Sequence, residues 1–167
     1  MKILALALTL FLTRPVHAEL RAGATAVDVT PAVLPVLVNG GMFTRSVDTV
    51  NTRVHARALA LADRHEQIVI VVVDTCMMGR ALLDEVKALA APRTGIATNR
   101  MLISATHAHS APSSMACLGT DADPRYVTFL RDKIVEAIVA AQKNLEPAKV
   151  GWATANAAEF TALRQWI

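Results

Sequence analysis

Four segments of the chain carry patterns of apolar residues that are typical of β-strands. Val54–Ala62 alternates, with His55, Arg57, Leu59 and Leu61 on one side and small residues on the other. Gln67–Val73 is an unbroken β-branched run, which predicts a central strand covered on both faces. Met101–Ala105 returns to the same character, and Ala24–Val29 predicts an opening strand that ends at Pro31 because proline cannot donate to a ladder.

Two segments repeat apolar residues at the helical spacing of three or four. The first covers Leu82–Ala90 and is expected to stop at Pro92. The second follows Asp123, a favourable N-cap with proline behind it, and runs to Leu145. Pro31–Thr52 predicts a long loop, and Lys149–Ala155 predicts a last strand. Alternating strands and helices indicate an α/β fold, a layered mixed sheet with flanking helices.

The N-terminal residues 1–18 have the pattern of a secretory signal peptide. Lys2 precedes a short apolar run, and Ala18 ends a small-residue cleavage signal. The run is about half the 20 residues that span a bilayer, and no later segment is longer, so we expect no transmembrane segment after cleavage. We therefore predict a secreted or periplasmic protein whose residues 19–167 form part of one domain. The final residues, Trp166 and Ile167, look like the start of an element, which suggests an interrupted domain.

Charge and aromatic content argue against a nucleic-acid partner. The formal net charge of +3 includes Lys2 and Arg14, and their removal with the signal leaves 15 basic and 14 acidic residues. The basic residues are scattered singly, and aromatic residues make up only 4% of the chain, so neither a phosphate-binding patch nor a base-stacking surface is expected.

The candidate chemistry lies after two of the predicted strands. His107 and His109 follow Met101–Ala105 at i and i+2, so in extended chain both would point the same way and converge on one metal ion or substrate. Asp74 follows Gln67–Val73 and would approach them as a carboxylate that orients an imidazole. The alternative is a solvated loop with two ordinary histidines.

Other candidate residues are weaker. His55 fits a hydrogen-bonded core position and His65 a surface turn, while Ser110 lacks a nucleophile elbow. Cys76 and Cys117 fit either a disulfide, which an exported chain allows, or two buried thiols.

The stretch Thr-His-Ala-His-Ser-Ala-Pro at 106–112 resembles the T-H-T-H-S-x-P signature of neutral/alkaline ceramidases. Three further segments agree in order: residues 24–31 resemble the opening strand of that family, 54–61 its H-x-R-A segment and 71–74 its next strand. The resemblance implies a zinc-dependent amidohydrolase in which metal-activated water cleaves a lipid-like N-acyl amide, as in the hydrolysis of ceramide to fatty acid and sphingoid base.

By this resemblance His107 is a zinc ligand and His109 assists catalysis by hydrogen bonding the substrate or moving a proton. Asp74 keeps its supporting role from its position after the neighbouring strand alone. The remaining ligands of such enzymes, a histidine, a glutamate and a tyrosine, would lie downstream, so this chain alone should bind metal weakly and be nearly inactive. Ser113 and Ser114 stand where the family signature is rich in glycine. The chain departs from the family pattern at these residues, and the departure bears on the identity of the substrate, ceramide in particular.

Two other functions fit the same residues. One is an exported non-catalytic α/β domain that binds a ligand or partner at the strand ends. The other is an enzyme of related fold that acts on a different amide or an ester.

Overall fold

The structure is a computed structural model that describes residues 20–160 and 162. The predicted signal peptide at 1–18, and Trp166 with Ile167, lie outside the described residues. Within the described part, no helix has the length and apolar character needed to cross a membrane.

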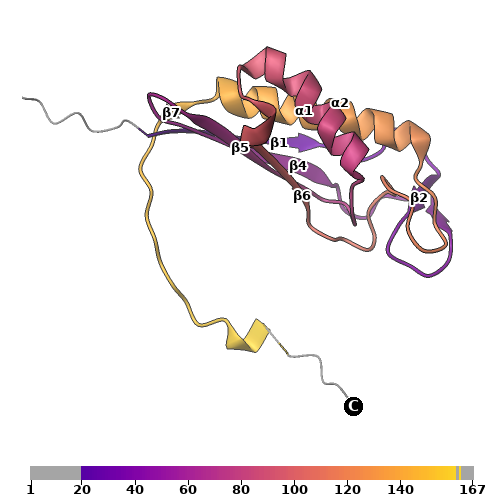
Figure 1. Ribbon diagram of the computed structural model, residues 1–167. Coiled ribbons are helices and arrows are strands. Elements are labelled where there is room, and N and C mark those ends of the chain that lie inside the picture. The colour runs from indigo at the N-terminus through magenta and orange to yellow at the C-terminus, as the bar shows by residue number, and fades with distance from the viewer. Residues whose placement is uncertain (1–19, 161, 163–167) are drawn as a thin grey trace, which may run out of the picture.

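A five-stranded mixed sheet forms the centre of the fold, in the order β6-β5-β4-β1-β7. Its strands are β1 (Arg21–Asp28), β4 (His55–Ala62), β5 (Gln67–Val73), β6 (Met101–Ala105) and β7 (Glu146–Pro147). Only β5 and β6 pair in parallel, with Val73 opposite Ala105. The helix α1 (Arg80–Thr94) connects them and, together with α2 (Pro124–Lys143), lies on one side of the sheet (Figure 1). The predicted mixed α/β fold is confirmed.

Small residues let α2 pack closely on the sheet. The alternate residues of β4 that face the helices are all alanines, from Ala56 to Ala62, and all are buried. A Cβ atom placed on Gly23 of β1 would lie 2.2 Å from the carbonyl oxygen of Ala141 in α2, so the helix backbone rests against the strand. The alternation expected for this region is confirmed, with the small side facing the core.

The other face of the sheet is not covered by a second layer among the described residues. Val69, Val71 and Val73 are fully buried beneath the helices, but the alternating Ile68, Ile70 and Val72 are only half-buried. Leu102 on β6 is 60% exposed. The expectation that β5 is central in the sheet is correct, whereas the expected cover on both faces is absent from the described part of the chain.

The first helix extends further than the sequence predicts. Helix α1 passes through Pro92 and ends at Thr94. Pro92 removes one bond of the last turn, yet the turn is held by the Gly95 N–H, which donates to Ala91 O at 2.9 Å, and by the Thr94 hydroxyl, which donates to Ala90 O. Gly95 adopts φ 74°, the left-handed conformation of a helix C-cap.

Two expectations about irregular segments are wrong in part. The long loop at 31–52 contains a short antiparallel pair, β2 (Val36–Val38) and β3 (Arg45–Val47). Residues 149–155 form no strand and are exposed, because they have no neighbouring strand with which to pair. The chain returns to the sheet earlier, through the two residues of β7 against Arg21 and Ala22. Short single turns of 3₁₀ helix lie at Thr98–Arg100 and Ala158–Phe160.

Candidate metal centre

The two segments that carry the predicted chemistry meet at the carboxyl ends of the parallel strands β5 and β6. Beyond the last ladder pair, Thr106 N–H donates to Val73 O at 2.9 Å and Ala108 N–H donates to Thr75 O at 3.1 Å. These bonds extend the pairing past the strands, so the residues after Val73 and those after Ala105 remain side by side. This is the edge of an α/β sheet at which ligands bind.

His107 and His109 converge as the sequence predicts, although not in extended chain. Their rings are 4.6 Å apart between centroids, at an interplanar angle of 82°, and their Nε2 atoms are 3.0 Å apart. His107 has φ 63°, a left-handed conformation that is uncommon for a residue with a side chain. The backbone turns at this residue, and the turn brings the rings together while both side chains stay exposed.

The hydrogen bonds of His107 define which of its nitrogens carries the proton. Nδ1 lies 2.8 Å from the carbonyl oxygen of Cys76, and a carbonyl can only accept, so Nδ1–H is the donor. In the neutral ring Nε2 then has a free lone pair, and the 3.0 Å contact requires His109 to donate from its own Nε2. The arrangement leaves His107 Nε2 available to a metal ion, with the ring held by a backbone carbonyl on its opposite side.

Cys76 is a third candidate ligand, although the sequence predicts for it only a disulfide or a buried thiol. Its side chain is buried, and its Sγ lies 3.7 Å from His107 Nδ1. One ligand atom from each of Cys76, His107 and His109 lies within 4.8 Å of the others. Burial, and secondarily Cys117, raises the pKa of the Cys76 thiol, so the group is protonated at neutral pH. Both cysteines are free thiols in this structure.

The loop before β3 holds His109 from the other side. A Cβ atom on Gly40 would lie 2.6 Å from His109, and Gly40 has φ 95°, so only glycine fits there. Arg45 Nη2 donates to His109 O at 3.0 Å. The buried Asn39 fixes this loop, because its Nδ2 donates to Met115 O at 2.6 Å and its Oδ1 accepts from Gly40 N–H. The missing side chain of Gly40 thus leaves the space that the imidazole of His109 occupies.

Asp74 occupies the expected position after β5 but has other partners than those expected. Its carboxylate accepts two hydrogen bonds from Arg57 Nη1, each of 2.8 Å, and one from His55 N–H at 2.9 Å. The imidazole of His107 is oriented by the Cys76 carbonyl instead. Asp74 lines a pocket of about 430 Å³ together with Ala108 and Ser110, the residues that alternate with the two histidines.

The other two histidines among the described residues take no part in this cluster. His55 is half-buried on β4, and its backbone exchanges hydrogen bonds with Asp74. His65 is exposed in the turn after β4, where its N–H donates to Asp63 Oδ1. These are the two residues that the sequence assigns to structural and surface positions.

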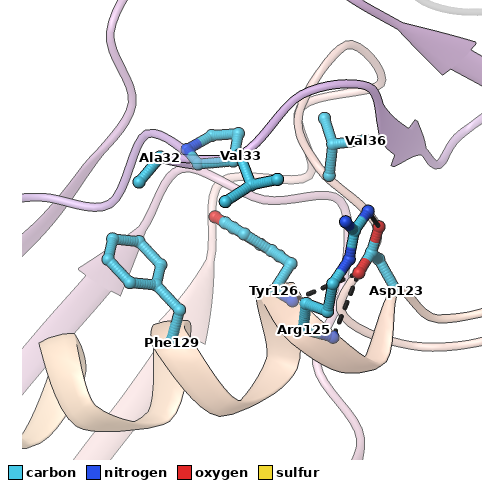
Figure 2. A pocket seen from close by; sticks show the side chains of 8 residues that line it. Ala32, Val33, Val36, Asp123, Arg125, Tyr126 and Phe129 are labelled. Atoms are coloured by element: carbon cyan, nitrogen blue, oxygen red, sulfur yellow. Dashed lines mark hydrogen bonds and ion pairs between the residues drawn. The ribbon is translucent and has the colours of Figure 1, made fainter.

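A second, smaller pocket of about 90 Å³ lies between the loop after β1 and the first turn of α2. Figure 2 shows the Tyr126 hydroxyl directed from the helix toward Ala32 and Val33. Tyr126 is 3% exposed, and its hydroxyl has no hydrogen-bond partner among the described residues. Asp123 caps the same turn by accepting from the N–H groups of Arg125 and Tyr126. Burial raises the pKa of the Tyr126 phenol, which stays neutral.

The donor set at the strand ends suits a borderline-soft cation. Two imidazoles and a thiol are ligands that Zn²⁺ accepts, whereas Mg²⁺ and Ca²⁺ prefer oxygen. The residues present therefore fit zinc.

Comparison with solved structures supports the fold. The chain is similar to a crystal structure of neutral ceramidase from Pseudomonas aeruginosa, with a TM-score of 0.70 and 24% identity, covering 78% of this chain and 22% of that one. A second match, a ceramidase complexed with C2, has a TM-score of 0.68 and 23% identity with the same coverage. The chain thus spans about a fifth of the length of these ceramidases. No curated protein sequence matches it.

A family model described as neutral/alkaline non-lysosomal ceramidase, N-terminal, matches residues 20–164. That range includes all of the described residues, with the sheet, both helices and the histidine cluster. The chain therefore belongs to the neutral/alkaline non-lysosomal ceramidase family, of which it carries the N-terminal part.

Proposed function

We propose that this chain supplies the N-terminal half of the catalytic centre of a zinc-dependent amidohydrolase that cleaves the N-acyl amide of a ceramide-like lipid into fatty acid and sphingoid base. The observation that carries the proposal is the position of His107, whose Nε2 lies 3.0 Å from Nε2 of His109 and whose Nδ1 lies 2.8 Å from the Cys76 carbonyl, at the carboxyl ends of parallel strands. Membership of the ceramidase family supports the reaction class.

His107 is the proposed zinc ligand. The Cys76 carbonyl accepts a hydrogen bond from His107 Nδ1, and the ring cannot flip without losing that bond. The Nε2 atom therefore remains available to a metal ion. A zinc ion in such a site lowers the pKa of a bound water and polarises the acyl carbonyl.

His109 is the proposed acid–base residue. In the pair its Nε2 carries a proton directed at the ligand atom of His107, and the side chain is exposed, so a substrate can reach it. Gly40 and Arg45 hold it from the opposite side. A positioned imidazole of this kind can donate a hydrogen bond to the substrate or transfer a proton to the leaving amine.

Asp74 is proposed as a supporting residue of the same centre. Its carboxylate ties Arg57 and the His55 backbone on β4 to the end of β5, directly before the segment that contains Cys76. The carboxylate therefore holds the end of β5 in place. The segment that follows this strand end carries the Cys76 carbonyl that bonds His107.

The chain covers 22% of the solved ceramidases, so the complete activity belongs to a longer polypeptide. We propose that the remaining zinc ligands come from downstream sequence and that this chain alone turns over little substrate. We also propose that residues 1–18 are a signal peptide and that the protein is exported to the periplasm or the medium.

The test uses the full-length protein that contains this chain, assayed on an N-acyl sphingosine. His107→Ala is expected to abolish both stoichiometric zinc and amide hydrolysis, whereas His65→Ala, a matched change at an exposed histidine, leaves both unchanged. Hydrolysis that persists in His107→Ala would contradict the proposal. A wild-type protein that binds a lipid without cleaving any amide would favour the alternative, an exported non-catalytic binding domain.

A further inference from the structure

The segment between β5 and α1 carries the carbonyl that orients His107, yet it belongs to neither element. Residues 74–79 form no helix or strand. The Cys76 carbonyl oxygen in this segment lies 2.8 Å from His107 Nδ1, so the direction of the ring depends on how the irregular backbone is held. Backbone of this kind is fixed by hydrogen bonds from side chains and from neighbouring loops.

Ser114 contacts this segment on both sides of Cys76. Its hydroxyl donates to Met77 O at 2.7 Å, and its Oγ lies 3.3 Å from Thr75 Oγ1. A carbonyl can only accept, so the Ser114 proton goes to Met77. The Thr75 hydroxyl then shares its own proton between Ser114 Oγ and Pro112 O, each at 3.3 Å. Ser114 and Thr75 are both buried, which shields these bonds from water.

Ser114 belongs to the same loop as His107, and its bonds form a second connection between the two strand ends. Close to the strands, Ala108 N–H donates to Thr75 O at 3.1 Å. Seven positions after His107, Ser114 returns to the same segment from the far side of the loop. The Cys76 carbonyl thus lies between two residues that this loop holds in place. Alanine at position 114 would fill the same space without making either hydroxyl bond.

We propose that Ser114 is a positioning residue for the zinc ligand His107. Its hydroxyl holds Met77 and Thr75 on either side of Cys76, and the Cys76 carbonyl holds the ring with Nε2 available to a metal ion. The inference rests on the proposed zinc role of His107. Partners that orient a ligand imidazole contribute about 10–100-fold to metal affinity or activity, and Ser114 acts one contact further away, so about tenfold is expected.

The experiment compares Ser114→Ala with Thr94→Val in the full-length protein. Thr94 is buried at the end of α1, where its hydroxyl donates to Ala90 O at 2.9 Å, so Thr94→Val removes a comparable buried hydroxyl away from the histidines. Zinc affinity is measured by competition with a chelator, and amide hydrolysis of the zinc-saturated protein is measured as kcat and KM.

Ser114→Ala is expected to bind zinc about tenfold more weakly than wild type. At saturating zinc it should lower kcat and leave KM unchanged, because a displaced imidazole affects the chemical step and not the binding of substrate. Thr94→Val should lower stability alone and keep the zinc affinity and kcat of wild type.

A wild-type zinc affinity in Ser114→Ala would overturn the inference, while the His107→Ala test above still decides the proposed function. An equal loss of affinity in Thr94→Val would also overturn it, because general destabilisation would then be the cause. If the wild-type protein cleaves no amide, the proposed reaction fails, and the zinc affinities alone decide the role of Ser114. Should Ser114→Ala not fold, Thr75→Val removes the other hydroxyl of the pair at nearly constant shape. The same tenfold loss is expected there, and an unchanged zinc affinity contradicts the proposal.

Discussion

Gly40 lies against the imidazole of His109 so closely that a Cβ atom on it would be 2.6 Å from the His109 side chain. The contact joins the loop before β3 to the segment after β6, which are far apart in sequence. It makes Gly40 a determinant of where the proposed acid–base residue points, through its missing side chain and its φ of 95°.

Gly40→Ala is expected to lower amide hydrolysis by the full-length protein by about 100-fold, the scale on which a 1 Å misplacement acts. The added methyl group must push His109 away from His107 Nε2. Gly41→Ala is the matched control, because a Cβ there meets nothing closer than 3.6 Å and the backbone is not left-handed. Equal activity in the two variants, measured as kcat/KM, would show that the position of His109 does not matter.

Asp74→Ala is expected to lower the free energy of unfolding by about 1–3 kcal/mol, since hydrogen bonds to a charged group are lost and the His55 N–H is left without an acceptor. Asp84→Ala, which breaks an exposed pair with Arg80, should change it by less than about 1 kcal/mol. Urea unfolding of both variants checks the difference. If Asp74→Ala is as stable as Asp84→Ala, Asp74 does not support the strand end.

Tyr126→Phe is expected to leave stability unchanged or to raise it by about 1 kcal/mol, because it removes a buried hydroxyl that has no partner among the described residues. Tyr126→Ala should instead cost about 3–5 kcal/mol, as the loss of a large buried ring does. Thermal and chemical unfolding measure both. A destabilised Tyr126→Phe would mean that the hydroxyl is hydrogen bonded in solution.

Asp28 should make stability depend on pH in the acid range. Its pKa is lowered to about 2, chiefly by hydrogen bonds from the Thr30 hydroxyl and N–H and further by Arg53. A carboxyl whose folded pKa lies below its unfolded value stabilises the protein above the unfolded value of 3.8 and loses that contribution as the pH falls toward 2. The free energy of unfolding should therefore decrease more between pH 5 and pH 2.5 in the wild-type protein than in Asp28→Asn. Parallel falls would contradict the assignment.

The sequence predicts the elements whose signals are local. Asp123 with Pro124 starts α2 at the expected residue, and the β-branched run of β5 forms a strand inside the sheet. The prediction that α1 stops at Pro92 is wrong because hydrogen bonds from Gly95 and Thr94 close the turn that contains this proline. The spacing of apolar residues carries no information about these two bonds. Lys149–Ala155 alternates without a partner strand, and pairing is a tertiary property.

For the site, two histidines at i and i+2 after a strand predict the convergence but not its cause. The pair forms through the left-handed turn at His107 and the space left by Gly40, neither of which a spacing rule contains. Cys76 escapes the pattern because it belongs to the other strand end, and the pairing of β5 with β6 brings it to His107. Its only sequence signal is its place two residues after Asp74.

The most direct test of the account is the anomalous scattering of zinc in crystals of the metal-loaded full-length protein. The account predicts a zinc peak about 2.0–2.1 Å from Nε2 of His107, with Nδ1 of the same ring still bonded to the Cys76 carbonyl. A zinc site that does not include His107, or a ring reversed so that Nδ1 meets the metal, would contradict it.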